Sequence, residues 1–457
     1  MSEERKTIYL CLAHMSEDGM EQKYVKEAFD TNWVVPMGPN VNAFEQDLAN
    51  FANGNTDGSK LDRKVVCLSA GTAAVHLALL ACGVGPGDEV LVQSFTFCAS
   101  SHPITYLAAK PVFVGSEPTT WNMDPELLEK AIIDRKAVTG KYPKAIVPVA
   151  LYGMPYDCDK IMAIADKYGI SVVEDAAEGM GSRFNGQVLG TFGKYGVLSF
   201  NGNKMITTSG GGALICHRAE DANTVMWYAT QARDAYPYYE HTAIGYNYRM
   251  SNVCAGIGRG QMTVLNDHIA HHKHVQSLYE ALLADVPGVH LHKQPTNEEL
   301  GMRNEECPKY DSNYWLCAAT IDPEVRIKGQ ENAYKEVIKT AVGGAAGVIK
   351  AVDSATTDCQ PNENVEALRV FMLNKRVECR PVWKPMHCQP VYRNGAVVSE
   401  VSEGLKVSEG PNMVAYVNGV SEAIFKVGFC LPAGPYVSDD DVRYIVDCIK
   451  EAIVAER

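Results

Sequence analysis

The stretch "KVVCLSAGTAAVHLALLACGV", Lys64 to Val84, joins a short β-rich run to a helical run through one Ala-Gly pair. Its first part is apolar and rich in valine, which is typical of a buried strand. Its second part, from Gly71 onward, carries alanine and leucine residues that favour a helix. A strand that passes directly into a helix predicts a layered α/β fold.

The same alternation continues from about residue 65 to residue 217. The β-rich runs include "DEVLVQS" (88–94), "KAIVPVALY" (144–152) and "ISVVEDAA" (170–177), and helical runs such as "DCDKIMAIADKYG" (157–169) separate them. This order predicts a mostly parallel sheet with helices on both faces. Ligands of such sheets bind outside the carboxyl ends of the strands.

The length of 457 residues suits one large domain and a smaller one. We predict an N-terminal arm and substrate-mouth loop over residues 1–44, a large α/β/α domain over 45–300, and a small C-terminal α+β domain over 301–457. A long helix is expected over 255–285. Residues 325–362 and 396–414 are interpreted as insertions; the second contains "VSEG" twice.

Charge and cysteine usage narrow the function classes. The formal net charge of −13 argues against binding to nucleic acid, although an anionic small ligand stays open because a pocket can be locally positive. The sequence has no apolar run of membrane-spanning length, and its first residues lack the layout of a signal peptide. The 14 cysteines form no C-x-x-C pair. We therefore expect a cytoplasmic protein with free thiols and no membrane partner.

Gly71 and Thr72 lie where a strand gives way to a helix. Free backbone N–H groups at a helix start bind phosphate. An ordinary helix cap by Thr72 explains the same residues and is favoured when they are taken alone. The stretch is not a G-x-G-x-x-G fingerprint, which counts against a dinucleotide.

Asp175 ends an apolar strand, where a carboxylate is costly without a partner. It can cap a following helix, or it can pair with a buried cationic ring nitrogen. The sequence leaves both interpretations open.

Lys204 is the one long cation in "SFNGNKMITTSGGG", Ser199 to Gly212. A lysine in such a turn is usually solvated. Here Ser199 is a candidate phosphate ligand, the glycines allow close backbone approach, and Lys204 follows Asp175 by one strand–loop unit. A partly desolvated lysine also forms Schiff bases. A phosphate cradle, a carboxylate and a nucleophilic lysine together match the three groups by which pyridoxal 5′-phosphate (PLP) is held: its phosphate, its ring nitrogen and its aldehyde.

Two further clusters need an interpretation. "RPVWKPMH" (380–387) holds Arg380, Trp383, Lys384 and His387, and with Arg249 it is a candidate site for a diphosphate and a base; the alternative is a buried turn with solvated cations. "DHIAHHKH" (267–274) holds His268, His271 and His272 at helical spacing. We favour a solvated or subunit-facing helix there and expect no metal, because no carboxylate or cysteine completes a site.

Five segments together resemble one protein family. They are residues 69–114, "VVEDAAEGMGSRFNG" (172–186), "SFNGNKMITTSGGGALI" (199–215), "GYNYRMSNVCAGIGRGQM" (245–262) and "RPVWKPMHCQPVY" (380–392). Their order is similar to that of the PLP-dependent nucleotide-sugar aminotransferases, the DegT group of fold type I in the aspartate aminotransferase superfamily. Three segments, "TNWVVPMGPNV" (31–41), "SFNGNK" (199–204) and "RPVWKPMH" (380–387), are most similar to bacillosamine-type enzymes, which act on UDP-linked 4-keto-6-deoxy-N-acetylhexosamines. GDP-perosamine synthases are nearby relatives.

The resemblance implies a role for each matching residue. Lys204 would be the Schiff-base lysine and proton shuttle, and Asp175 the partner of the pyridine nitrogen. Cofactor contacts would come from Gly71, Thr72, Phe97, Asp175, Glu178, Ser199, Lys204 and Asn247. In this set Phe97 would stack on the cofactor ring, although an ordinary core phenylalanine is an open alternative. Glu178 would contact the cofactor near its 3′-oxygen or the sugar. Asn247 would serve the neighbouring subunit, which implies a homodimer with shared active sites. Substrate contacts would come from Arg249, Trp383, Lys384 and His387.

The resemblance therefore implies transfer of an amine, from glutamate through PLP, to C4 of a nucleotide-linked 4-keto-6-deoxy sugar for surface glycan biosynthesis. A GDP-perosamine-type synthase is one alternative. A PLP-dependent sugar dehydratase is another, but Lys204 disfavours it because those relatives carry histidine in its place. A non-enzymatic cofactor-binding regulator is the third, and the sequence has no evident basic helix-turn-helix region to support it.

Overall fold

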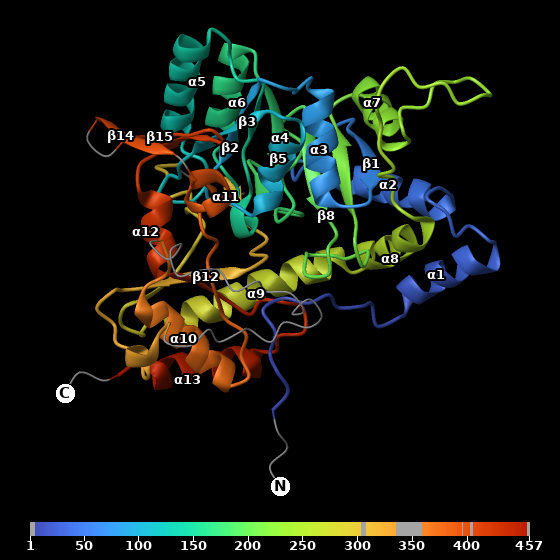
Figure 1. The fold of residues 1–457 in the computed structure, drawn as a ribbon. Helices are drawn as coiled ribbons and strands as arrows, with labels where there is room; N and C mark the ends of the chain where they lie inside the picture. The colour runs from blue at the N-terminus through green and yellow to red at the C-terminus, as the bar shows by residue number, and fades with distance from the viewer. Residues whose placement is uncertain (1–4, 303–307, 335–358, 395, 403–404, 455–457) are drawn as a thin grey trace.

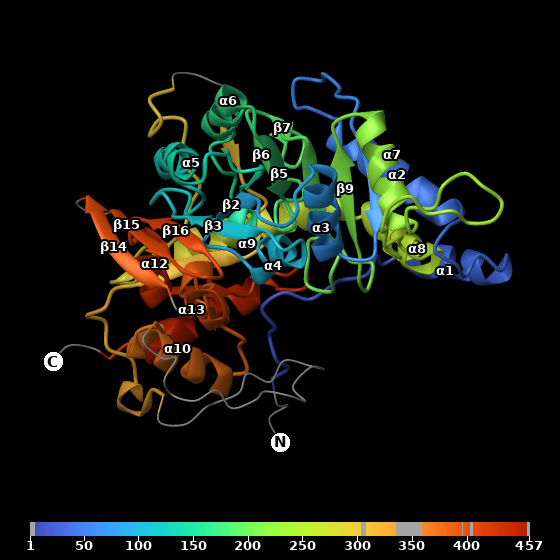
Figure 2. The same cartoon turned by 45° about the horizontal axis from the view of Figure 1, so that its top comes forward.

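The computed structural model describes residues 5–302, 308–334, 359–394, 396–402 and 405–454. A large layered domain lies above a smaller one in Figure 1, and Figure 2 shows helices on both sides of the large sheet. The alternation of strand and helix between residues 65 and 217 is present as predicted.

The large sheet has ten strands in the order β1-β9-β8-β5-β4-β2-β3-β16-β15-β14. Neighbouring strands from β8 to β16 in this order are parallel, and β1, β9, β14 and β15 pair antiparallel. The bounds are β1 Lys64–Leu68, β2 Glu89–Gln93, β3 Lys110–Val114, β4 Ala145–Val147, β5 Ser171–Asp175, β8 Tyr195–Ser199, β9 Gly212–Cys216, β14 Val397–Ser402, β15 Leu405–Glu409 and β16 Val414–Val417.

Alternate side chains of these strands enter two separate cores. In β1, Val65 and Cys67 belong to one core, whereas Val66 and Leu68 belong to the other. Because both faces of the sheet are buried, the strands are apolar along their length rather than alternating with polar residues. The first core packs against α2 (Pro39–Ala52), α5 (Pro125–Thr139) and α6 (Cys158–Tyr168), and the second against α3 (Gly71–Ala81), α4 (His102–Tyr106) and α7 (Ala219–Ala229).

The small domain is built on a four-stranded antiparallel sheet, β10-β12-β17-β13. Its strands are β10 Val289–Leu291, β12 Cys317–Ile321, β13 Arg380–Pro381 and β17 Gly428–Leu431. A third core joins this sheet to α9 (Leu265–Leu283), α10 (Glu363–Asn374) and α13 (Asp439–Ala452). The remaining helices are α1 Met20–Asp30, α8 Asn252–Met262, α11 Pro390–Arg393 and α12 Val420–Val427, and a three-stranded sheet comprises β6 Arg183–Phe184, β7 Gln187–Val188 and β11 Tyr310–Asp311.

The two sheets do not divide at residue 300 as the predicted domains do. β10, at residues 289–291, already belongs to the small sheet. β14, β15 and β16, assigned from sequence to the small domain, extend the large sheet, and β16 pairs in parallel with β3. The segment 396–414, interpreted as an insertion, therefore contributes β14 and β15 to the large sheet, where they pair antiparallel. Most of the other predicted insertion, 325–362, lies outside the described residues.

The predicted helix over 255–285 is two helices, α8 and α9, with a break at Thr263 and Val264. The predicted N-terminal arm contacts both domains. α1 packs on α8 so closely that a Cβ on Gly260 would lie 2.4 Å from the backbone nitrogen of Glu21. Upstream, Ile8 pairs in parallel with Val377 of the small domain. Among the described residues, no helix combines the length and apolar character needed to cross a membrane.

Candidate active site

The carboxyl ends of β5 and β8 bring the predicted residues to one edge of the sheet. Asp175 is the last residue of β5, and Ser199 is the last residue of β8, the strand paired with β5. Lys204 lies in the connection from β8 to β9, and Gly71 begins α3 beside Ser199. Parallel strands place their carboxyl ends on a common edge, which explains why residues far apart in sequence meet here.

Asp175 is 5% exposed, and its carboxylate accepts hydrogen bonds from Ser100 Oγ (2.6 Å) and from the backbone N–H of Ala177 (3.2 Å). Burial raises the pKa of Asp175, against the lowering effect of these bonds and of Lys204. No helix follows Asp175, so the helix-cap interpretation is wrong. A buried carboxylate of this kind is suited to a cationic partner.

Lys204 is not a solvated turn lysine. Its side chain is 12% exposed, and Nζ donates a hydrogen bond to Glu178 Oε1 at 3.3 Å. Nζ also lies 4.1 Å from the centroid of the buried Trp315 ring, which is a cation–π contact. Trp315 is held in turn, because its Nε1 donates to the backbone carbonyl of Asn203 at 2.6 Å. The turn therefore directs the side chain of Lys204 toward the interior of the protein.

The start of α3 provides a narrow cradle next to Ser199. The residue before the helix is Ala70, and no side chain caps the helix; the Thr72 cap is wrong. A Cβ on Gly71 would lie 3.3 Å from Ser199 Oγ, and a Cβ on Gly212 would lie 2.4 Å from the nitrogen of Gly71. Glycine is thus required where β9 passes the helix start. Uncapped N–H groups at a helix N-terminus favour an anion such as phosphate.

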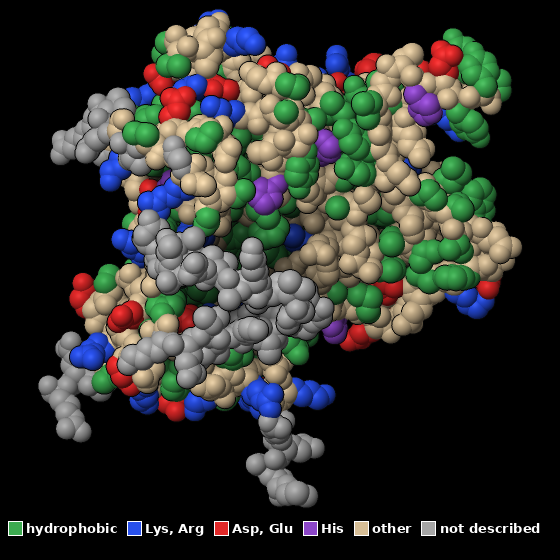
Figure 3. Space-filling model, viewed as in Figure 1, with side chains coloured by type: hydrophobic (Ala, Val, Ile, Leu, Met, Phe, Trp, Pro, Cys, Tyr) green, Lys and Arg blue, Asp and Glu red, His purple; other side chains and the backbone are tan. Residues whose placement is uncertain are grey.

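Phe97 is 51% exposed, which excludes the core-phenylalanine alternative. Its ring meets Trp383 edge to face, with 4.6 Å between the centroids. The backbone N–H of Trp383 donates to the hydroxyl of the buried Tyr152 at 2.8 Å. The structure therefore joins Phe97 of the large domain to the "RPVWKPMH" segment. Figure 3 shows the surface hollowed between the two domains, with hydrophobic side chains and a basic side chain inside the hollow.

Two predicted substrate residues have other partners. Arg249 is 9% exposed and bonds through Nη1 to Glu45 Oε1 (2.5 Å) and to the carbonyl of Cys67 (2.8 Å). His387 is buried between Ser94 Oγ (2.6 Å from Nδ1) and Glu422 Oε1 (3.1 Å from Nε2). Both ring nitrogens of His387 therefore have partners within the protein, and Arg249 anchors α2 through Glu45. The substrate-binding role of these two residues stays a prediction.

The other predicted polar residues, Lys384, Arg380 and Asn247, differ in how many partners their side chains have within the protein. Lys384 is partly buried, and its ammonium makes no ion pair with a described residue. Arg380, in the same segment, is paired with Glu378 at 2.5 Å. Asn247 is exposed and is held through its backbone bridge to Thr230, so its side chain is presented outward.

The histidines of α9 face the interior, contrary to the solvated helix favoured from sequence. His268, His271 and His272 each bond to a backbone carbonyl, those of Met205, Val437 and Tyr314. Burial lowers the pKa of His272 to about 3, so this ring is neutral at ordinary pH. Within the described ranges, no three His, Cys, Asp or Glu side chains are grouped to hold a metal ion.

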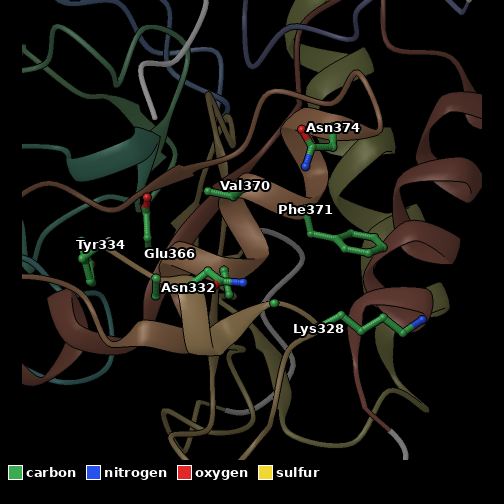
Figure 4. Close-up of a pocket in the computed structure, with 10 residues that line it drawn as sticks. Lys328, Asn332, Tyr334, Glu366, Val370, Phe371 and Asn374 are labelled. Atoms are coloured by element: carbon green, nitrogen blue, oxygen red, sulfur yellow. The ribbon is translucent and has the colours of Figure 1, made fainter. Parts of the chain in front are cut away.

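Two other hollows are lined by described residues that include none of the predicted site residues. One of about 240 Å³ lies in the small domain and is lined by Lys328, Asn332, Tyr334, Glu366, Val370, Phe371 and Asn374, among others (Figure 4). The Glu366 carboxylate in this cavity forms an ion pair with Arg369, with 2.6 Å between Oε1 and Nη2. A larger one, of about 760 Å³, lies at the amino ends of β2 and β3, the opposite edge of the sheet from Lys204. The predicted residues lie instead at the carboxyl edge of the sheet.

Several residues of the site were not predicted. They are Ser100, Tyr152, Asn313 and Trp315. Ser100 lies within the "SFTFCAS" motif, but nothing in the motif pairs its hydroxyl with Asp175. Trp315 comes from a segment assigned to the small domain, and only the tertiary fold brings it to Lys204.

Comparison with known proteins places this arrangement in a family. The model of the DegT/DnrJ/EryC1/StrS aminotransferase family matches residues 15–343. EpsN of Bacillus subtilis (strain 168) is 35% identical over 447 residues, covering 97% of this chain and 95% of its own. GDP-perosamine synthase of Caulobacter vibrioides is 32% identical over 437 residues, covering 96% of each chain. A DegT DnrJ EryC1 StrS aminotransferase from Brucella abortus has the same fold, with a TM-score of 0.73, 24% identity and 95% coverage of both chains.

The fold and the site define a PLP-dependent sugar aminotransferase of fold type I. The chain belongs to the DegT/DnrJ/EryC1/StrS aminotransferase family. The predicted fold, enzyme class and cofactor are thereby confirmed.

The residues present fit this cofactor. The glycine cradle at α3 and Ser199 would hold its phosphate, and Asp175 would face its ring nitrogen, giving the buried carboxylate a cationic partner. The exposed ring of Phe97 would lie against its face. When bound, PLP supplies an electron sink that makes the α-hydrogen of an amino acid acidic.

Proposed function

We propose that this enzyme transfers an amino group to the C4 ketone of a nucleotide-linked 4-keto-6-deoxy sugar, UDP-N-acetylhexosamine derived, with glutamate as the donor. The product is a 4-amino sugar nucleotide for surface glycan biosynthesis. The observation that carries the proposal is the largely buried amine of Lys204, held between Glu178 and Trp315 beside the buried Asp175. An amine in that position can bond to an aldehyde and can move a proton.

Each residue has a task in this proposal. Asp175 keeps the ring nitrogen of the cofactor protonated, and Ser100 fixes the direction of its carboxylate. Lys204 holds the cofactor covalently and then moves a proton as a neutral amine. Phe97 and Trp383 exclude water and offer aromatic surface to the cofactor and the sugar nucleotide. Lys384, without an ion pair to a described residue, is the candidate for the diphosphate.

A homodimer is part of the proposal. The exposed Asn247 would reach the phosphate site of a second copy. Exposed aromatic residues in the same region, Tyr236, Tyr238 and Tyr239, supply apolar area for such a contact.

The relatives support two candidate nucleotides for the substrate. A relative from Pseudomonas aeruginosa, 36% identical over 253 residues, is a UDP-2-acetamido-2-deoxy-3-oxo-D-glucuronate aminotransferase and supports a UDP sugar. Relatives from three organisms that align along nearly the whole chain are GDP-perosamine synthases, which favours a GDP-linked 4-keto sugar as the second candidate.

One experiment separates these candidates. The protein, loaded with PLP, is incubated with glutamate and with UDP-, GDP- and dTDP-linked 4-keto sugars, and the products are analysed by mass spectrometry. We expect exchange of the keto oxygen for an amine only with the UDP-linked sugar. Turnover of the GDP-linked sugar alone would establish the second candidate. The Lys204→Ala variant should lose both the visible absorbance of the loaded protein and turnover; visible absorbance retained by that variant would contradict the role of Lys204.

A further inference from the structure

Glu178 has no assigned chemistry beyond a contact with the cofactor, yet it is the only carboxylate bonded to Lys204 among the described residues. Its side chain is 5% exposed, and Oε1 accepts a hydrogen bond from Lys204 Nζ at 3.3 Å. Its other oxygen, Oε2, accepts a hydrogen bond from the backbone N–H of Tyr152 at 2.8 Å. The carboxylate is thus fixed at one end and bonded to the reactive amine at the other.

The backbone around Glu178 is arranged to hold this position. Tyr152 has φ 54° and ψ 19°, the left-handed region that residues other than glycine rarely adopt. That conformation directs its N–H at Glu178. Asn313 Nδ2 donates to the carbonyls of Glu178 and Met180, both at 2.9 Å, and closes the turn after β5. Strained backbone persists where the surrounding structure over-determines it, and it is frequent at functional sites.

Lys204 must lose a proton before it can react, because an ammonium nitrogen has no lone pair to form a bond. The charged groups that face Glu178 are Lys204 and Asp175, with the hydroxyl of Tyr152 and the thiol of Cys430 as further titratable neighbours. Asp175 is engaged by Ser100 and Ala177. Burial raises the pKa of Glu178, although Lys204 and the Tyr152 N–H act in the opposite direction. A buried carboxylate with a raised proton affinity is a suitable acceptor.

We propose that Glu178 is the base that takes the proton of Lys204 and so allows the amine to capture the PLP aldehyde. The proton moves from Nζ to Oε1, and the freed lone pair of Nζ forms the new N–C bond. The aldehyde oxygen leaves as water. One of its two hydrogens comes from Nζ directly, and the other is returned by Glu178, which ends as a carboxylate. Charge and atoms balance without an added reagent.

This inference rests on the proposed role of Lys204, and its test separates the two. Cofactor-free protein is mixed with PLP in a stopped-flow instrument at several pH values between 6.5 and 9.5. Quenching of tryptophan fluorescence reports arrival of the cofactor near Trp315 and Trp383, and visible absorbance reports the covalent bond. Wild type is compared with Glu178→Gln, which keeps the shape but cannot accept a proton, and with Glu178→Asp, which retains a carboxylate.

In each protein the absorbance rate is compared with that protein's own quenching rate, so that a change in cofactor arrival is separated from a change in the covalent step. The absorbance rate of Glu178→Gln should fall by about 100-fold or more near pH 7, the range typical of a lost general base, and should recover as the pH rises. Glu178→Asp should lose less, and the covalent step in wild type should slow in D2O, a measurement that needs no variant. Equal absorbance rates for wild type and Glu178→Gln at every pH would overturn the role of Glu178 alone. Quenching without visible absorbance in wild type would instead overturn the role of Lys204.

Discussion

The hydrogen bond from Ser100 to Asp175 gives a stability prediction whose size follows from the structure. Both residues are buried, and Ser100 Oγ lies 2.6 Å from Asp175 Oδ2. A hydrogen bond to a charged group contributes about 1.5–3 kcal/mol. In Ser100→Ala the ionised form of the Asp175 carboxylate would lose its shortest donor. We therefore expect the cofactor-free variant to lose about 1.5–3 kcal/mol of unfolding free energy at pH 7.5.

The matched control is Ser101→Ala. Ser101 is equally buried, but its hydroxyl bonds to neutral groups, the carbonyl of Cys98 at 3.3 Å and the Tyr392 hydroxyl at 3.1 Å. Bonds between neutral groups contribute about 0.5–1.5 kcal/mol, so Ser101→Ala should cost less. The assay is urea unfolding of cofactor-free wild type and both variants.

A sharper test is how the difference in unfolding free energy between the two variants changes with pH. Burial raises the folded-state pKa of Asp175 above its usual value of 3.8, and loss of the Ser100 bond raises it further. A group with a raised folded pKa stabilises the fold when it is protonated and costs stability when it is ionised. The excess cost of Ser100→Ala should therefore be complete above the folded pKa of Asp175 and should shrink as the pH falls through it. Equal costs of the two variants at every pH, or an excess that grows toward acid, would refute the reasoning.

Three further predictions concern other parts of the chain. The hydrogen bond from Cys388, together with Lys384 and His387, lowers the pKa of Cys359 to about 6, whereas burial raises the pKa of Cys98. Iodoacetamide at pH 7 should therefore label Cys359 before Cys98, as followed by peptide mapping, and the labelling rate of Cys359 should be halved near pH 6. Preferential labelling of Cys98 would contradict this. Burial alone would raise the pKa of Glu422, but the hydrogen bond and charge of His387 lower it to about 2. His387→Gln should therefore lower the free energy of unfolding by about 1–3 kcal/mol in urea at pH 7, and this loss should shrink as the pH falls below 4.5 toward 2. The KM for the sugar nucleotide should stay unchanged. A raised KM with unchanged stability would instead support the substrate role of His387. Phe97→Leu should weaken PLP binding about three- to tenfold in a fluorescence titration, because an aromatic contact contributes about 0.5–1.5 kcal/mol; unchanged affinity would exclude stacking.

The sequence was sufficient for the parallel sheet and for the edge where the chemistry lies. Apolar strands followed directly by helices dictate a sheet buried on both faces, and Asp175, Ser199 and Lys204 each follow or end such a strand. These positions depend on local pattern alone.

What local pattern could not supply is the partner of each side chain. His387 belongs to an aromatic and basic motif, but the positions of Ser94 and Glu422, far away in sequence, decide that its ring faces inward. In the same way, the ion pair with Glu45 decides where the side chain of Arg249 points. The contact of Trp315 with Lys204 depends on how the small domain meets the large one, which no short segment encodes.

The return of residues 414–417 to the large sheet has a consequence for how the protein is made. β3 ends at residue 114, yet its outer partner β16 leaves the ribosome some three hundred residues later. Until then the edge of β3, with Val112, Phe113 and Val114, offers unpaired backbone and apolar side chains that invite pairing with another nascent chain. Fragments that stop before β16 should thus be aggregation-prone during synthesis, however complete their catalytic residues are.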